Sequence, residues 1–408
     1  MSDATLHDSD SHGRLKVLDG LRAVAILLVM VMHSLRDFQA DSSIHFLPFS
    51  FIDLSSLLYN GWIGVYLFFV LSGFLIGNQL IKISPLTGRH KRQALGYYFK
   101  IRFFRIAPAY YLVLVIFLFS YYIVPHMQDG LNPADLFSWV KRLAVHLFFM
   151  QDYMPPPLAA YFWSLAVEAK FYLAAPFLIS GLFMLSTTKA RLTALSSLAF
   201  FLILVRALTV FVISDTFHGY DSYFFLIQSR FHLALDPLLA GLFCAILWSD
   251  GKARALIRNP ILANTLFLMG STGLALLTVT QSIDYPLSKT GDKILMPSIL
   301  AIGFSLVMLG LLGQCKGYKI FENRFFRFIA LISYSLYLTH GFCLRLQNVV
   351  IDFLADVEIA PIAHPVYWFA SLPVFFLSSI FLAYPLYRFV ERPLINWSKK
   401  PPSDKHQT

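Results

Sequence analysis

Two residues on the first apolar segment of this chain have side chains that could do chemistry: an arginine that binds anions and a histidine that exchanges protons. Arg22 and His33 are eleven residues apart in the stretch LDGLRAVAILLVMVMHS. At roughly 100° and 1.5 Å per residue, a helix places them on one face, about 16 Å apart along its axis. A neutral imidazole, with a reference pKa of about 6.5, can take a proton near pH 7. The spacing predicts two chemically distinct positions on one helix face.

Three further apolar segments carry polar side chains at a depth that we expect to match His33, counted from the same membrane face. Glu168 lies about 10 Å from the start of YFWSLAVEAKFY at the helical rise. Arg230 has a similar depth in the apolar segment 223–248. Tyr337 and His340 share one helix face in ISYSLYLTHG. Ionisable groups inside a membrane cost about 2.5–3.5 kcal/mol each and usually face a partner or a cavity. We therefore predict one polar site formed by four helices.

Each of these positions also has a structural interpretation. Glu168 and Arg230 could form an ion pair between two helices. The spacing of His232 and Asp236 suits a hydrogen bond within one helix. Arg22 could extend its side chain to nearby lipid headgroups. The two histidines and the tyrosine of the predicted site could be packing groups that hydrogen-bond neighbouring helices.

The segment GRHKRQALGYYFKIRFFRIAP has the densest positive charge in the chain. Arg102 and Arg105 are three residues apart, so they face nearly the same way just before Pro108, which is expected to open the next apolar helix. Two guanidinium groups close together suit a phosphate-bearing ligand, either a lipid headgroup or a nucleotide-like donor. The alternative is a topology signal only, because positive charge gathers in cytoplasmic loops.

The composition requires a membrane-embedded bundle to position these residues. Of the 408 residues, 57% are hydrophobic and 14% are charged, whereas ordinary globular chains have roughly 25% charged residues. This excludes a series of soluble domains, and the three cysteines exclude a disulfide scaffold. A membrane-spanning helix needs about 20 mostly apolar residues. The sequence thus predicts an all-α polytopic bundle with ten spans, at 17–35, 62–81, 108–124, 161–184, 192–213, 223–248, 261–280, 294–313, 328–351 and 363–386.

The lysines and arginines predict how these spans are oriented. If the short apolar stretch 136–150 does not cross, 23 of the 33 Lys and Arg lie on one side and five on the other. The richer side is then cytoplasmic. We expect both termini in the cytoplasm, a polar tail at 1–16, a membrane domain at 17–397 and a basic tail at 398–408. Stretch 136–150 becomes an external interfacial or re-entrant segment. The net charge of +10 reports this orientation, so we expect no nucleic-acid partner.

The second predicted span, NGWIGVYLFFVLSGFLIG, is expected to pack closely against a neighbour. Gly73 and Gly77 have the small-xxx-small spacing that lets two helix backbones approach each other. We interpret this pair as a packing feature rather than as part of a binding site.

Six motifs follow one another along the chain in a recognisable order. They are LDGLRAVAILLVMVMH, GVYLFFVLSGFLIG, FKIRFFRIAPAYYL, WSLAVEAKFY, ISYSLYLTH and VERPLINW. With these motifs the chain resembles the acyltransferase 3 family of membrane O-acyltransferases, which modify cell-envelope sugars and some secreted small molecules. The resemblance runs from about Leu18 to Trp397 and covers nearly the whole chain.

The resemblance implies roles for residues at matching positions. His33 matches the essential first-helix histidine, and Arg22 matches the arginine that accompanies it. Arg102 and Arg105 match the cytoplasmic pair associated with the acyl-CoA donor. Glu168 matches the acidic residue of the fourth motif.

Two positions depart from the family pattern. Tyr66 stands where the second motif usually has aspartate, so no role of that aspartate is transferred and the choice of acceptor could differ. Thr339 precedes His340 where tryptophan is commoner. Because the sequence after the last predicted span shows no esterase-like segment, we expect the stand-alone form of the family.

The resemblance implies transfer of an acyl group, expected to be acetyl, from cytosolic acyl-CoA to a hydroxyl of an extracytoplasmic carbohydrate such as an envelope polysaccharide or glycolipid. His33 would act as general base or briefly carry the acyl group. Glu168 would orient His33 or balance its charge, or pair with Arg230. Arg230, Tyr337 and His340 are predicted to bind substrate.

Acyl-CoA is then a donor substrate, and we expect no permanently bound cofactor and no metal site. The expected location is a bacterial inner membrane, with lipids as further partners. A proton-coupled secondary transporter of a small molecule is the competing interpretation, because intramembrane His, Glu and Arg can relay protons. Internal repeats and paired broken helices would favour a transporter, and the sequence shows neither.

Overall fold

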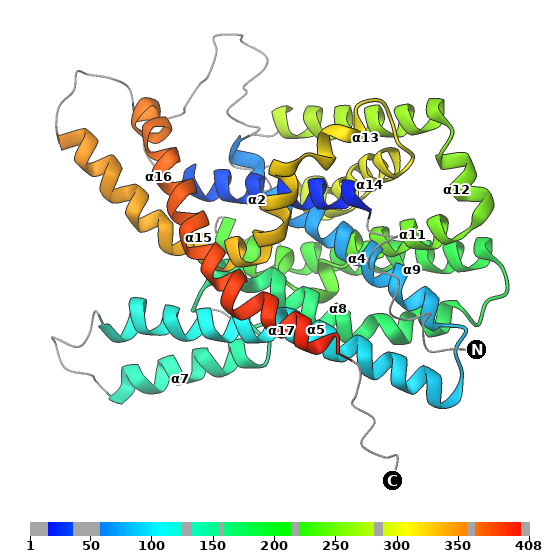
Figure 1. Ribbon diagram of the computed structural model, residues 1–408, viewed down its shortest axis with the longest axis horizontal. Coiled ribbons are helices and arrows are strands. Elements are labelled where there is room, and N and C mark those ends of the chain that lie inside the picture. Colours follow the sequence, from blue (N-terminus) through cyan, green and yellow to red (C-terminus); the bar gives the residue numbers. More distant parts are fainter. Residues whose placement is uncertain are drawn as a thin grey trace.

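The computed structural model of the protein describes residues 15–35, 58–124, 133–154, 158–213, 220–280, 289–356 and 364–400. These residues form helices joined by short connections and contain no strand (Figure 1). Nine helical segments among them are long and apolar enough to cross a membrane. The predicted fold class, an all-α polytopic bundle, is confirmed. Most of the predicted tails at 1–16 and 398–408 lies outside the described residues.

Eight long helices follow predicted spans. They are α2 (Lys16–Leu35), α4 (Ile63–Ile83), α8 (Trp163–Leu182), α9 (Thr188–Val212), α13 (Pro260–Thr280), α14 (Thr290–Leu312), α15 (Arg324–Asp356) and α16 (His364–Pro385). Shorter helical elements adjoin them at η3 (Asn60–Trp62), η5 (Ala160–Phe162), α12 (Gly251–Ile257), η9 (Tyr318–Glu322), η10 (Leu386–Glu391) and α17 (Arg392–Ser398).

The third span is longer than predicted. Helix α5 (Gly88–Leu118) continues through Pro108 and ends in the π-helical segment η4 (Phe119–Ile123). Pro108 therefore does not open the helix. The residues around it, including Ala107 and Ala109, are buried, and packing against neighbouring helices lets a membrane helix tolerate a proline. One continuous helix consequently carries the predicted arginine pair into the bundle.

Helix α7 (Pro133–Leu147) lies beside the end of α5 (Figure 1) and is too short to be counted among the helices that could cross. His146, near its end, is fully buried. Its Nδ1 lies 2.8 Å from the hydroxyl of Tyr110, and its Nε2 accepts a 3.0 Å hydrogen bond from the Leu158 amide. Burial lowers the pKa of His146 to about 4, so the ring stays neutral near pH 7. This bond fixes the connection that leads into η5.

The sixth predicted span, 223–248, is broken. Helix α10 (Tyr220–Tyr223) and the π-helical η7 (Phe224–Gln228) precede a 3-10 turn, η8 (Phe231–Leu233), and α11 begins only at Asp236 and ends at Ser249. The prediction of one continuous helix was wrong.

Pro237 accounts for this break. Proline has no amide hydrogen and clashes with the carbonyl four residues earlier, which here belongs to Leu233. The fully buried Arg206 of α9 donates a 2.8 Å hydrogen bond to that carbonyl and forms an ion pair with Asp236. Asp236 is therefore bonded to Arg206, and the predicted pair of Asp236 with His232 was wrong.

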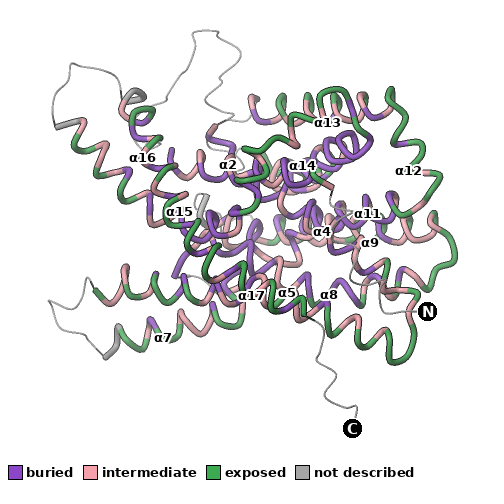
Figure 2. Tube along the Cα trace, viewed as in Figure 1, coloured by how far each residue is buried: buried purple, intermediate pink, exposed green. Residues whose placement is uncertain are grey.

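Glycines bring three helices together at the centre of the bundle, where Figure 2 shows the buried residues. A Cβ on Gly64 of α4 would collide with the carbonyl oxygen of Ala25 in α2, and one on Gly73 would collide with that of Leu238 in α11. A Cβ on Gly77 would come within 2.7 Å of the Leu242 side chain. The predicted close packing at Gly73 and Gly77 is confirmed, and α11 is the partner helix.

We predict that Gly73→Ala destabilises the protein, because the added methyl group collides with the Leu238 backbone. Overpacking of this kind costs typically about 1–3 kcal/mol. Thermal unfolding of the purified protein in detergent measures the effect. The matched control is Gly96→Ala in α5, where an added Cβ has nothing within 4 Å. Equal unfolding temperatures for both variants would contradict this account of the bundle centre.

Candidate active site

The end of α2 and the middle of α15 bring two histidines into contact. His33 Nδ1 lies 3.1 Å from His340 Nε2, and the two ring centroids are 5.0 Å apart. His340 is fully buried, whereas His33 is partly exposed. The structure thus unites two of the residues that the sequence assigned to one polar site.

The hydrogen bonds of His340 determine which nitrogens carry protons. Its Nδ1 lies 3.1 Å from the Leu336 carbonyl oxygen and 2.9 Å from that of Tyr337. Carbonyl oxygens only accept, so Nδ1 of His340 carries a hydrogen and, in the neutral ring, Nε2 holds the lone pair. His33 must then donate from Nδ1. The lone pair of a neutral His33 consequently lies on Nε2, which makes that atom the basic position of the pair.

Tyr161 of η5 packs against both histidines. Its ring centroid lies 6.2 Å from that of His33 and 5.1 Å from that of His340. Gly341 is required beside it, because a Cβ there would come within 2.7 Å of the Tyr161 hydroxyl. Sequence reasoning missed Tyr161. The only signal was its place at the start of the fourth span.

Tyr337 of α15 holds the Tyr161 backbone beside the two histidines. Its hydroxyl lies 2.6 Å from Ser164 Oγ and donates a hydrogen bond to the Tyr161 carbonyl. Tyr337 therefore holds the backbone that carries Tyr161, and within the described residues these protein groups are the hydrogen-bond partners of its hydroxyl.

Glu168 lies away from the histidine pair. Its Oε1 accepts hydrogen bonds of 2.5 Å from Ser72 Oγ and from Tyr172 OH. Glu168 follows Tyr161 by seven residues, which is about 10 Å along a helix, and Tyr161 is the residue level with His33. The predicted shared depth of Glu168 and His33 was therefore wrong. His33 is hydrogen-bonded to His340 rather than to Glu168.

Arg230 lies in extended backbone at the break before α11. Its Nε donates a 3.3 Å hydrogen bond to the Phe225 carbonyl. The predicted ion pair of Arg230 with Glu168 was wrong, because the break removes Arg230 from the helix on which that prediction depended.

Three arginines gather at the opposite end of α2, which we call the arginine end; the end with His33 and His340 is the histidine end. Arg102 Nη2 donates a 2.6 Å hydrogen bond to Gln79 Oε1, and its guanidinium lies 5.2 Å from the Tyr172 ring centroid. Arg22 lies within electrostatic range of Arg105 and Glu168. The predicted grouping of Arg22, Arg102 and Arg105 is consistent with this arrangement.

The arginine end contains one buried hydrogen-bond donor that is unsatisfied among the described residues. Nε of Arg102 is buried and has no hydrogen-bond partner among the described residues. An unsatisfied donor on a charged group is costly, and a phosphate oxygen is the kind of acceptor that an arginine binds best.

Polar groups line the bundle between these two ends. From the arginine end, Tyr172, Glu168 and Ser72 are joined by hydrogen bonds. Ser164 and Tyr337 follow, and the latter bonds the backbone of the residue that touches both histidines. Polar side chains inside a membrane bundle usually face a cavity or a ligand.

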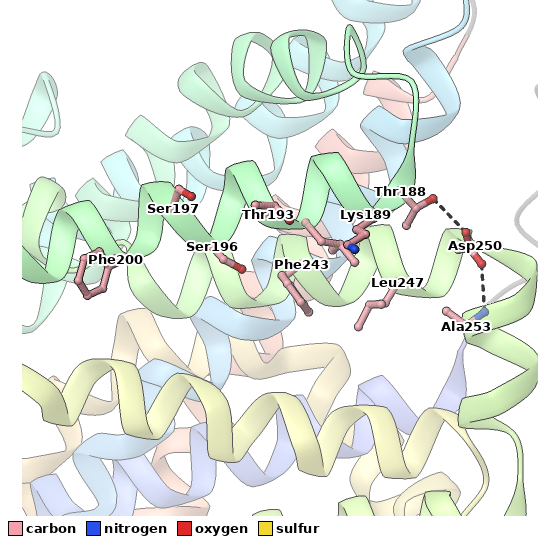
Figure 3. A pocket seen from close by; sticks show the side chains of 11 residues that line it. Thr188, Lys189, Thr193, Ser196, Ser197, Phe200, Phe243, Leu247, Asp250 and Ala253 are labelled. Carbon is pink, nitrogen blue, oxygen red and sulfur yellow. Dashed lines mark hydrogen bonds between the residues drawn. The ribbon is translucent and has the colours of Figure 1, made fainter.

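A groove in the described part of the chain lies away from these residues. It has a volume of about 710 Å³ and lies between α9, α11 and α12, where Thr188 donates a 2.9 Å hydrogen bond to Asp250 (Figure 3). None of the predicted site residues lines it. Among the described residues, no group of His, Cys, Asp or Glu could hold a metal ion.

The fold and the site define a polytopic helical membrane protein with a basic histidine at one end and an arginine cluster at the other. The family model described as an acyltransferase domain matches residues 15–388. The chain belongs to this family, the acyltransferase 3 family.

The relatives are named as O-acetyltransferases. The chain is 27% identical over 396 residues to the peptidoglycan O-acetyltransferase OatA of Listeria monocytogenes serovar 1/2a, covering 92% of this chain and 55% of that protein. It is 28% identical over 411 residues to YrhL of Bacillus subtilis strain 168, named provisionally as a peptidoglycan O-acetyltransferase, covering 95% and 56%. A provisionally named O-acetyltransferase of Staphylococcus aureus strain COL is 26% identical over 400 residues, covering 93% and 58%.

The chain therefore spans little more than half the length of these relatives. No solved structure matches it significantly.

Proposed function

We propose that the protein is a membrane O-acetyltransferase that moves an acetyl group from acetyl-CoA at the arginine end to a hydroxyl of an envelope carbohydrate at the histidine end. The observation that carries this proposal is the His33–His340 hydrogen bond, which gives the family's first-helix histidine a basic Nε2. The names of the relatives support acetyl as the acyl group and make peptidoglycan the first acceptor to test.

Donor binding at the arginine end follows from charge. The phosphates of acetyl-CoA need cationic partners, and Arg22, Arg102 and Arg105 supply three guanidinium groups. The buried Nε of Arg102 has no protein acceptor among the described residues, which supports a ligand there. The excess of Lys and Arg on this side of the predicted topology makes it cytoplasmic, in a bacterial inner membrane with both termini inside.

The reaction needs a base at the acceptor hydroxyl. His33 Nε2 takes the hydroxyl proton while the oxygen attacks the thioester carbonyl. The carbon–sulfur bond breaks, and the sulfur of coenzyme A takes the proton back from His33. An ester and a free thiol are the products. The same lone pair could instead attack the thioester first and carry the acetyl group on the imidazole.

The distance between the arginine end and the histidine end suits donor binding at one end and acetyl transfer at the other. Arg22 and His33 are about 16 Å apart along α2 at the helical rise, so an extended pantetheine arm would connect phosphates at one end with a thioester at the other. The Glu168 carboxylate and the hydroxyls of Ser72 and Ser164, which lie between the two ends, would bind the amides of the pantetheine arm. The charged nucleotide then never enters the hydrocarbon region, which would be costly.

The transporter alternative has one observation in its favour. The break at residues 229–235 is a discontinuous helix, a feature of many transporters. The match to the acyltransferase family across residues 15–388 outweighs it.

We predict that His33→Ala lowers acetyl transfer by about 10²–10⁴-fold, the usual contribution of a general base. The measurement is transfer of labelled acetyl from acetyl-CoA to peptidoglycan in membrane vesicles with matched protein levels. The matched control is His90→Ala, which removes an exposed histidine of α5 and should leave transfer unchanged. Full activity of His33→Ala would refute the proposed mechanism.

We also predict that the double change Arg102→Ala/Arg105→Ala raises the KM for acetyl-CoA about tenfold or more, because hydrogen bonds to charged groups are worth roughly 1.5–3 kcal/mol. Initial rates over a range of acetyl-CoA concentrations measure this. The control Lys91→Ala/Arg92→Ala removes the same charge from the same helix. An equal KM for both double variants would reduce the arginine pair to a topology signal.

A further inference from the structure

The break before α11 lies within a polar cluster on the side of α8 that faces away from Glu168. Ser229 and Arg230 begin the break, and the ammonium of Lys170 from α8 reaches it through an ion pair with Asp152, which accepts a hydrogen bond from the Phe231 amide. Non-helical backbone at membrane depth is tolerated only where protein covers it or where it lines a water-filled cavity. Arg230 and Lys170 are each partly exposed, so protein does not cover this cluster completely.

The charges of the cluster do not cancel. Lys170 is paired with Asp152, whose second carboxylate oxygen also accepts a 3.3 Å hydrogen bond from the Phe231 amide. The other ion pair at the break, Arg206 with Asp236, is internally balanced. Arg230 has no carboxylate partner among the described residues, where its guanidinium makes one hydrogen bond, to the Phe225 carbonyl. One positive charge is left over.

A second observation points to a ligand. The Oγ of Ser229 is buried and has no hydrogen-bond partner in the described part of the chain, and Ser229 is fully inaccessible. A buried hydroxyl without a partner is destabilising. Ser229 directly precedes Arg230 in the chain, and a hydroxyl and a guanidinium are both donors that an oxyanion accepts from.

Aromatic and polar contacts connect the residues beside Arg230. The rings of Tyr153 and His232 are stacked at 7°, and the Tyr153 hydroxyl lies 2.7 Å from His232 Nδ1. The Lys170 ammonium lies 4.7 Å from the Tyr153 ring centroid. The cluster is thus organised without a ligand, which lowers the entropic cost of binding one.

The connection between α7 and η5 joins this cluster to the histidine end. Asp152 and Tyr153 belong to this connection. It leads into η5, where Tyr161 contacts both histidines. Gln151 ties the two parts together, because its Nε2 donates a 3.0 Å hydrogen bond to the Phe162 carbonyl. A ligand at Arg230 would therefore lie on the same side of the membrane as the acceptor.

We propose that Ser229 and Arg230, with Lys170 beside them, form a subsite for an acidic group of the carbohydrate acceptor, a carboxylate or a phosphate. This proposal rests on the proposed function for the carbohydrate. It names the acceptor as an anionic polymer, with one sugar unit held at Arg230 and another presented to His33.

Binding to the purified full-length protein in detergent tests this subsite without any acyl transfer. The probes are fluorescently labelled tetrasaccharides of N-acetylglucosamine, of galacturonic acid, and of N-acetylglucosamine carrying a 6-phosphate. We expect at least one acidic probe to bind about tenfold more tightly than the neutral one, in keeping with one charge-assisted hydrogen bond. The tighter acidic probe identifies the oxyanion as carboxylate or phosphate.

Variants assign that preference to Arg230. Arg230→Gln should weaken the acidic probe about tenfold and leave the neutral probe unchanged, and Arg230→Lys should restore part of the loss. Arg191→Gln, which removes an arginine near the start of α9, is the control and should bind like the unchanged protein. Equal affinity for acidic and neutral probes in the unchanged protein, or an equal loss for both in Arg230→Gln, would overturn the proposal.

The two proposals fail separately. His33→Ala should retain the preference for the acidic probe, because Arg230 and Ser229 are intact. Retained acetyl transfer by His33→Ala with acidic preference intact would refute the catalytic role of His33 alone. Loss of the preference with His33-dependent transfer intact would refute the subsite alone.

Discussion

The hydrogen bond between His33 and His340 is the interaction on which the proposed chemistry depends. It joins two residues that are 307 positions apart in the chain, and close packing of the surrounding helices accompanies it. Close approach at Gly64 and Gly73 sets α2 against α4 and α4 against α11. The absence of a side chain at Gly341 leaves room for Tyr161. The backbone carbonyls of α15 then fix the His340 tautomer, which in turn fixes that of His33.

In the proposed function, helix α2 carries both the donor-binding arginine and the basic histidine, and its length separates them. A cation at one end suits the phosphates of a donor, and a base at the other suits an acceptor hydroxyl, so the two substrates can bind from opposite faces of a bundle. Glu168 belongs to the route between these ends rather than to the histidine pair, because Ser72 and Tyr172 hold its carboxylate. Under the proposed function, a neutral acetyl group passes through the bundle and the charged coenzyme A stays at the arginine end.

Apolar run length predicted nine of the ten spans, because each is a long stretch that only a helix can satisfy in lipid. The alignment of Arg22 with His33 was also predictable, since it depends on one helix alone. The relative depth of residues on different helices was not predictable. The level of Glu168 depended on which residue of the fourth span lies beside His33, and that of Arg230 on a break before Pro237. Pro237 was a readable signal for the break. Tyr161 was not predictable, because aromatic residues are common throughout this chain.

The central claim is that His340 sets the tautomer of His33 and leaves the basic lone pair on Nε2. Imidazole ¹⁵N chemical shifts of histidine-labelled protein in detergent micelles test it most directly, with the His33 signals assigned by their loss in His33→Gln. We predict a protonated Nδ1 and an unprotonated Nε2 for His33 at neutral pH, and a change of this pattern in His340→Ala. A protonated Nε2 with an unprotonated Nδ1 on His33 would contradict the account, because the atom assigned as the base would then hold a proton already.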